Sequence, residues 1–220
     1  MTTAQRESEV EDSLLRRRFG GSYAVDEWGL DKDLVAAASP LLALRWHIEA
    51  IGADVLPRKG PVLLVANCRF GWSEPFVLGR GIRLATGRFV RVAGVPDVAP
   101  LGPVMRSLGG VLARPDEIAG VLRAGAMAGV VLGQSVRRRH HAGAVRADLL
   151  APALSTGADV VPVALIGREL GRWWRLVVGP AIEHPTSRGP LAAADLAERV
   201  RNGVQSLLDE AFAPSPSRMS

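Results

Sequence analysis

A run of polar side chains follows an apolar segment near residue 65. Val62–Val65 are continuous apolar residues, and Asn67, Cys68, Ser73 and Glu74 come within the next nine positions. A thiol becomes a nucleophile or an acyl acceptor when it loses its proton, and a carboxylate can take a proton or orient a neighbouring group. Because ligands of α/β sheets bind where strands end, we expect a functional site here.

The elements that must position these residues alternate between strand and helix patterns. Val62–Val65 is apolar at every position, which is typical of a strand covered on both faces. Further strands are expected at 89–93, 111–113, 130–132, 160–166 and 176–178, and helices at 74–84, 104–108, 121–129, 148–156 and 191–212. Strands that alternate with helices predict an α/β fold, with a mostly parallel central sheet wrapped by helices.

The chain is expected to contain one folded domain. Residues 1–24 are polar and charged and predict a flexible N-terminal arm, 25–212 the domain, and 213–220 a disordered tail. Between 34 and 51, apolar residues recur at helical spacing. This pattern predicts a helix that packs on the domain, and the alternative is a helix that lies in a membrane interface with Trp46.

Positive charge is concentrated in the middle of the chain. Residues 58–180 carry 17 Lys/Arg against 7 Asp/Glu, whereas residues 1–57 carry 6 against 10. A basic block favours phosphate-bearing substrates, lipid headgroups or nucleic acid, and the alternative is a solvated arginine-rich face. With one cysteine, no secretory signal and no long apolar stretch, we expect a cytoplasmic protein, with a peripheral position at the inner face of the membrane as an option.

The segment GPVLLVANCRFGWSEPFVL resembles the first motif of the lysophospholipid acyltransferase family, the glycerophosphate acyltransferases of bacterial phospholipid synthesis. The family motif is Asn-His, four further residues and Asp-Pro. Here Cys68 follows Asn67, Ser73 stands at the aspartate position, and Glu74 comes one step later, before a proline. In the family the imidazole takes a proton from the acceptor hydroxyl and the carboxylate orients the imidazole. The resemblance assigns the catalytic positions to Cys68, Ser73 and Glu74.

Later segments resemble the remaining family blocks in the same order. LGGVLARP (108–115) matches the block whose arginine, here Arg114, binds the glycerol phosphate, and a guanidinium offers phosphate a planar fork of donors. GVVLGQSVR (129–137) stands where the family has a strand followed by Pro-Glu-Gly-Thr-Arg, and VVPVALIG (160–167) matches the last apolar block. Pro162 in that strand favours an edge or bulge position. The implied substrate-binding positions are Asn67, Arg69, Arg114, Gln134, Ser135 and Arg137.

The resemblance implies acyl transfer from acyl-CoA or an acyl carrier protein to a lysophospholipid-type acceptor, without a cofactor. Because Cys68 and Ser73 replace the family's His and Asp, we predict a divergent or inactive member, a pseudoenzyme that binds acyl lipid. The alternative is an active acyltransferase with a rearranged site that uses Cys68, Glu74, His140 or His141. Cys68 is otherwise explained as a small buried side chain, and Glu74 as an exposed residue in the first turn of a helix.

Nucleic-acid binding is the rival from a different class, because of the basic block. It is disfavoured, since the aromatic pairs are not interleaved through a basic sheet and no binding motif of known geometry is present. Trp173-Trp174 lies between Arg172 and Arg175, which favours a membrane-interface patch over a pair with one buried and one rim residue. No metal site is predicted, because four histidines and one cysteine lack ligand spacing.

Overall fold

The computed structural model describes residues 25–69, 71, 73–96, 98, 101–133, 141–169, 171–186 and 189–213. Along these residues the elements are α2 (Lys32–Arg45), β1 (His47–Ile51), the short helix η1 (Ala53–Val55), β2 (Val62–Ala66), α3 (Glu74–Thr86), β3 (Val90–Ala93), α4 (Leu101–Ser107), β4 (Gly110–Val111), α5 (Pro115–Arg123), β5 (Met127–Val131), α6 (Ala147–Thr156), β6 (Asp159–Gly167), β7 (Trp173–Val178) and α7 (Pro190–Phe212). The predicted N-terminal arm and 214–220 of the predicted tail lie outside the described residues.

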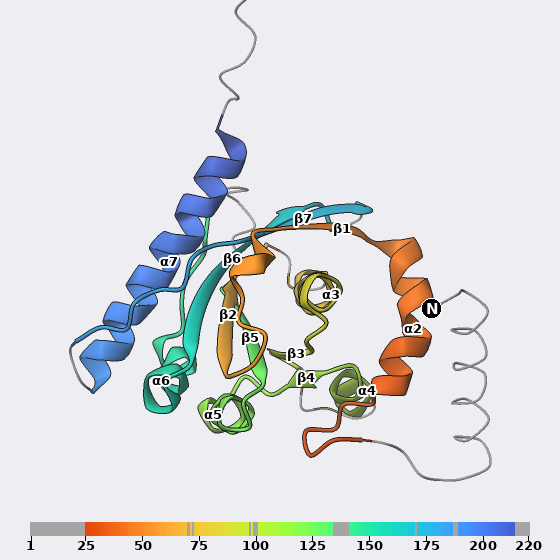
Figure 1. The fold of residues 1–220 in the computed structure, drawn as a ribbon, viewed down its shortest axis with the longest axis horizontal. Helices are drawn as coiled ribbons and strands as arrows, with labels where there is room; N and C mark the ends of the chain where they lie inside the picture. The colour runs from red at the N-terminus through yellow and green to blue at the C-terminus, as the bar shows by residue number, and fades with distance from the viewer. Residues whose placement is uncertain are drawn as a thin grey trace, which may run out of the picture.

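The strands form one seven-stranded sheet in the order β1-β7-β6-β2-β5-β3-β4 (Figure 1). Neighbouring strands are parallel except β6 and β7, which are antiparallel. The predicted fold class, a mostly parallel sheet wrapped by helices, is therefore confirmed. β2 lies in the middle of the sheet, and all five of its residues are buried, as a continuous apolar strand requires.

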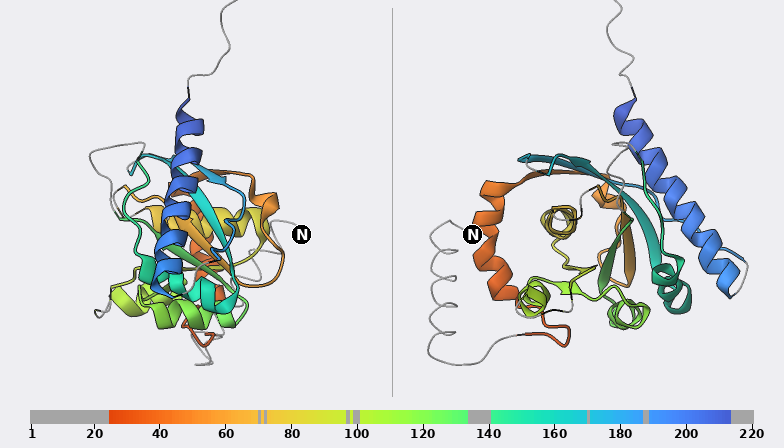
Figure 2. Two further views of the ribbon diagram at one scale, coloured as in Figure 1. Left: turned by 90° about the vertical axis from the view of Figure 1, so that its left-hand side faces the viewer. Right: turned by 180° about the vertical axis from the view of Figure 1, so that it is seen from behind.

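Helices cover both faces of the sheet. On one face, Ile118 of α5, Leu150 of α6 and Val200 of α7 belong to a single buried cluster. On the other face, Leu78 and Ile82 of α3 pack against the sheet in a second cluster, and Figure 1 shows α3 end-on beneath the arch of β1 and β7. Both views in Figure 2 show α7 as a long helix on the face of the sheet that α5 and α6 also cover. Among the residues described, no helix is both long and apolar enough to cross a membrane.

The predicted helix over 34–51 is too long. α2 ends at Arg45, and Ile48 and Ile51 lie in β1, which pairs in parallel with β7. Exposed and half-buried residues alternate along β1, and Ile48 packs on the cluster that contains α3. Two apolar residues three apart fit a helix, but the His-Ile-Glu-Ala alternation before Ile51 has the strand period, and sheet pairing decides the outcome.

Pro162 lies in an interior strand, so the predicted edge or bulge position is wrong. β6 has β2 on one side in continuous register, and its ladder with β7 begins one residue later, at Val163 opposite Val178. The Pro162 carbonyl accepts the N–H of Gly179 at 2.9 Å. Since the nitrogen of a strand residue faces the same side as its carbonyl, Pro162 N points just beyond the end of β7. Its missing N–H therefore removes no bond from the β6–β7 ladder.

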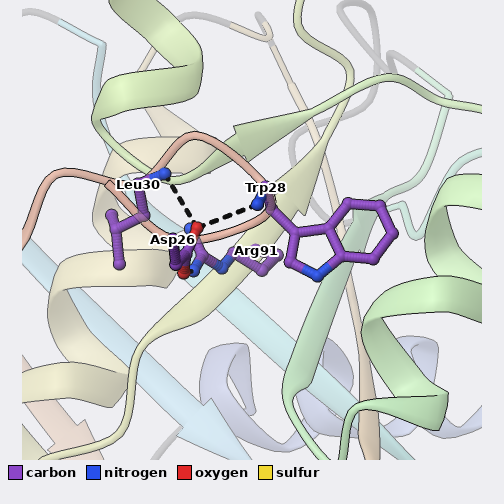
Figure 3. Close-up of polar contacts among 4 residues, drawn as sticks. All are labelled: Asp26, Trp28, Leu30 and Arg91. Atoms are coloured by element: carbon purple, nitrogen blue, oxygen red, sulfur yellow. Dashed lines mark hydrogen bonds and ion pairs between the residues drawn. The ribbon is translucent and has the colours of Figure 1, made fainter. Parts of the chain in front are cut away.

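A buried ion pair fastens segment 25–31 to β3 (Figure 3). Arg91 is 5% exposed, and its guanidinium donates to Asp26 Oδ2. The other carboxylate oxygen of Asp26 accepts the N–H groups of Trp28 and Leu30, each at 3.0 Å. Burial lowers the pKa of Arg91 to about 10, so the guanidinium remains charged at neutral pH. The carboxylate thus neutralises a buried charge and also shapes the turn.

We expect Asp26→Asn to lower the free energy of unfolding by about 1–3 kcal/mol. The amide oxygen can still accept both backbone N–H groups, but Arg91 loses its countercharge. Urea unfolding followed by circular dichroism measures the change. The matched control is Asp195→Asn, which breaks an exposed Arg–Asp pair on α7 and should cost much less. Equal losses in the two variants would show that the buried pair has no special role.

Candidate functional site

The carboxyl ends of β2, β5 and β6 meet at one edge of the sheet, with β2 between the other two. Because β7 is antiparallel to β6, β7 begins at this edge, and so does β1, which follows α2. The segment after β2, the first turn of α3, the segment after β6 and the end of α2 are therefore neighbours. Asn67, Cys68, Ser73 and Glu74 lie here, at the edge where α/β sheets bind ligands.

Asn67 joins the ends of β2 and β6. Its side-chain Nδ2 donates to the Leu165 carbonyl at 2.9 Å, and its Oδ1 accepts the Leu165 N–H at 2.6 Å. Both polar groups of the amide thus bind backbone in a buried position, and they satisfy a strand residue at the end of the β2–β6 ladder. This geometry gives the side chain a structural task. The predicted contact of Asn67 with a substrate stays a prediction.

The carboxylate of Glu74 is buried, so the prediction of an exposed residue is wrong. Glu74 is 1% exposed, and its Oε1 accepts the N–H of Arg69 at 2.9 Å. Its Oε2 accepts the N–H of Gly71 at 3.0 Å. Gly71 has a φ of 89°, in the left-handed region that favours glycine. The carboxylate therefore holds the loop between β2 and α3 from inside, which a helix-dipole role on the surface would not require.

Ser73 binds the carboxylate of Glu169, a residue that is not part of the sequence motifs. Its hydroxyl donates to Glu169 Oε1 at 2.6 Å, a short distance typical of a charge-assisted hydrogen bond. Ser73 makes no cap hydrogen bond to α3, although it precedes the helix. Glu169 lies two residues beyond the end of β6. The only sequence signal for it is an acidic residue just after a strand that matches the last family block.

The end of α2 holds the segment that carries Glu169. Arg45 Nη2 donates to the Glu169 carbonyl at 2.6 Å, and Nη1 donates to the Gly171 carbonyl at 2.9 Å. The next residue, Trp46, stacks on Phe76 of α3 with ring centroids 6.0 Å apart. These contacts connect α2 to both sides of the site, and they place an arginine beside the backbone of Glu169 rather than at its carboxylate.

Cys68 carries a buried thiol that is influenced by two acidic groups. It is 3% exposed, in agreement with the prediction of a small buried side chain. Burial raises the pKa of its thiol to about 12, and the charges of Glu74 and Glu169 act in the same direction. At neutral pH the thiolate is therefore rare, and a neutral thiol is a weak nucleophile and a poor proton acceptor. This environment is the reverse of the electropositive one that activates catalytic cysteines.

Arg114 lies at the same edge of the sheet but far to one side. It follows β4 and precedes α5 in an extended conformation. The loop before it is held by Glu117, whose Oε2 accepts the N–H of Leu112 at 2.8 Å. β4 is three strands away from β2, roughly 14 Å at the usual strand spacing.

The third block of the resemblance falls mostly outside the described residues. Gln134, Ser135 and Arg137 are among those not described, as is His140, so their predicted roles stay predictions. On either side of this block, the Gly133 N–H donates to the Ala144 carbonyl at 2.7 Å. Nearby, His141 Nδ1 accepts the N–H of Gly143 at 3.4 Å. Across the described ranges, no group of three His, Cys, Asp or Glu side chains is arranged to hold a metal ion.

Comparison with solved structures finds a match to an acyltransferase. The crystal structure of the 1-acyl-sn-glycerophosphate (LPA) acyltransferase PlsC from Thermotoga maritima superposes with a TM-score of 0.61 and 18% sequence identity, over 83% of this chain and 80% of that chain. The chain has the PlsC acyltransferase fold. No family model matches the sequence.

Two curated relatives are uncharacterized proteins of mycobacteria. The protein from Mycobacterium tuberculosis is 29% identical over 71% of this chain, and the protein from Mycobacterium leprae is 28% identical over the same share. The chain spans about half the length of these relatives, 49% and 47%.

We expect Cys68 to react with a thiol reagent such as iodoacetamide roughly 1,000-fold more slowly, near pH 8, than it does in the urea-unfolded chain. The reason is the small thiolate fraction of a thiol with a pKa of about 12. Reaction rates measured against pH give the apparent pKa directly.

Glu169→Gln removes one of the two charges and should lower that apparent pKa, whereas Asp148→Asn, an exposed site on α6, should not. An apparent pKa at or below the ordinary cysteine value in the natural protein would overturn this assignment and restore Cys68 as a candidate nucleophile.

Proposed function

We propose that the protein binds acyl lipids or acyl thioesters through a PlsC-like domain and does not carry out acyl transfer by the family's histidine mechanism. The observation that carries this proposal is the burial of Cys68 just after β2, where the charges of Glu74 and Glu169 also act on its thiol. A general base must have a pKa near the working pH and must lose and regain a proton easily. A thiol with a pKa of about 12 does not meet this requirement.

The proposed ligand class follows from the fold and the edge of the sheet. The likeness to PlsC supports acyl and lipid ligands in general, in the segment where the resemblance places catalytic residues. Of the proposed catalytic positions, Ser73 and Glu74 are each engaged in hydrogen bonds with protein groups. Such a site can hold a thioester or ester in place without supplying the proton transfer that would consume it.

The Ser73–Glu169 hydrogen bond favours a second candidate, an acyltransferase with a rearranged site. In that reaction Glu169 takes the hydroxyl proton while Ser73 Oγ attacks the thioester carbon, and the departing thiolate receives the proton. In the second half, Glu169 takes the proton of the acceptor hydroxyl while its oxygen attacks the acyl-serine carbon, and the departing Ser73 Oγ receives that proton. The 2.6 Å contact places the carboxylate correctly for the first proton transfer.

Incubation with labelled acyl-CoA and a panel of lysophospholipids tests the first proposal. We expect saturable binding and no transfer by the natural protein. The variant Cys68→His/Ser73→Asp/Glu169→Gln restores the family's catalytic pair. The third change is needed because Asp at position 73 would otherwise face the Glu169 carboxylate at hydrogen-bonding distance. For this variant we expect transfer at roughly 100-fold or more above the background rate measured with the natural protein, the usual contribution of a positioned base.

The control is Ser73→Ala, which separates the two candidates. Transfer by the natural protein that disappears in Ser73→Ala, with a labelled serine trapped by mass spectrometry, would establish the rearranged enzyme. Absence of both binding and transfer would refute a function at acyl groups. Transfer that persists in Ser73→Ala would refute both candidates as formulated.

We also propose that α2 contacts the surface of a membrane. No residue of α2 is buried, and Leu41 and Leu44 are 71% and 69% exposed. Leu101 and Val104 of α4, which contacts α2, are exposed as well. By contrast, Trp173 is exposed while Trp174 is buried, which confirms the alternative of one buried and one rim residue for that pair.

Leu41→Asp/Leu44→Asp should reduce co-sedimentation with phospholipid vesicles about 10-fold or more, because two charges oppose insertion of the helix into the interface. The melting temperature should change little, since both side chains already face solvent. Leu191→Asp, an exposed position on α7, is the control and should sediment like the natural protein. Unchanged sedimentation of the α2 variant would remove this helix from the proposal.

A further inference from the structure

Cationic side chains gather where α2 passes α3, on the side of α3 that faces away from the sheet. Arg80 Nη1 donates to Ser39 Oγ of α2 at 3.0 Å. One turn further along α3, the Arg83 guanidinium lies over the Phe89 ring, 4.4 Å from its centroid. Lys32, the first residue of α2, has its Nζ 6.0 Å from the same centroid. Two arginines and a lysine therefore lie around one hydroxyl and one aromatic ring.

These cations have no carboxylate partner in the part of the chain that the structure describes. The ion pairs found there use Arg91, Arg106, Arg146, Arg175 and Arg199. Arg80 Nε is also buried without a hydrogen-bond acceptor. Arg88, at the other end of α3, differs because its guanidinium donates to three backbone carbonyls and so has a structural task. Within the described residues, Lys32, Arg80 and Arg83 therefore have neither a carboxylate partner nor a backbone carbonyl partner.

Holding Arg80 and Arg83 together without an anion costs free energy. Burial lowers the pKa of Arg80, and burial together with the charge of Arg80 lowers the pKa of Arg83. Both shifts mean that the charged guanidinium is less favourable here than in water. An anion between the two side chains would offset this cost. A phosphate group is well suited, because its oxygens accept the paired N–H donors of arginine.

We propose that Lys32, Arg80 and Arg83 form a binding site for the phosphate group of a phosphate ester. The Nη groups of both arginines supply the donors, and Lys32 adds a third positive charge. This site is separate from Arg114 and from the end of β2. It does not rest on the proposed acyl-lipid function, because phosphate binding here needs no acyl group.

The position along α3 restricts which phosphate can occupy the site. Arg80 and Arg83 come six and nine residues after Glu74, which is about 9 and 13.5 Å along the helix axis. In a lysophospholipid, the phosphate and the acceptor hydroxyl belong to one three-carbon glycerol unit. A single such molecule cannot reach both Glu74 and this site. The phosphate therefore belongs to another ligand, either the nucleotide end of a coenzyme or the headgroup of a neighbouring phospholipid.

Binding to the full chain at constant ionic strength tests the site, with three probes. Calorimetry uses coenzyme A without an acyl chain and inorganic phosphate, and flotation uses phosphatidylcholine vesicles with and without phosphatidic acid. We expect at least one phosphate probe to bind the natural protein. The affinity should fall about 10- to 100-fold in Arg80→Gln/Arg83→Gln, the loss expected for charge-assisted hydrogen bonds. The probe that binds identifies the source of the phosphate.

The matched control is Arg123→Gln/Arg199→Gln, which removes two charges from α5 and α7 on the other face of the sheet and should bind normally. Without ligand, the Arg80→Gln/Arg83→Gln variant should melt no lower than the natural protein, because repulsion is relieved. Arg83→Gln alone, which leaves the Arg80–Ser39 contact, serves if the double variant does not fold. Absence of binding by every probe, or equal binding by the double variant and its control, would overturn the proposal.

Discussion

The site depends on one buried carboxylate, that of Glu74. Its two oxygens accept the N–H groups of Arg69 and Gly71, so the chain can leave β2, turn sharply and enter α3 with these donors satisfied. The same negative charge, added to burial, keeps the thiol of Cys68 protonated. The side chain that builds the loop thereby also contributes, after burial itself, to the raised pKa of the thiol within it.

The resemblance places a carboxylate at position 73, where this sequence has a serine. The carboxylate of Glu169 lies within hydrogen-bonding distance of that serine. Ser73 occupies the place of the motif's aspartate, and Glu169 reaches its hydroxyl from the end of β6. α3 therefore begins beside two carboxylates and carries Arg80 and Arg83 on its outer surface further along. The protonated Cys68 thiol near the start of α3 is therefore separated from the arginines further along the helix. This arrangement suits a ligand whose reactive group and charged group lie apart.

The sequence predicts the scaffold better than the site, for reasons visible in individual residues. β2 is recognisable because a strand buried on both faces must be apolar throughout, which Val62–Val65 satisfies. The Ser73–Glu169 contact joins residues 96 positions apart, and no local pattern encodes such a pair. The prediction for Pro162 is wrong because a proline can occupy this position of β6 only where β7 has ended and needs no N–H donor. The end of β7 is a property of the neighbouring strand and not of the sequence around Pro162.

The two hydrogen bonds from Arg45 to the carbonyls of Glu169 and Gly171 have a mechanical meaning. They make the end of α2 and the segment after β6 one rigid unit, while Ser73 belongs to a different unit, the loop held by Glu74. A displacement of α2 relative to the sheet would change the distance between the Glu169 carboxylate and the Ser73 hydroxyl. The two hydrogen bonds of Arg45 therefore link the position of α2 to the Ser73–Glu169 contact.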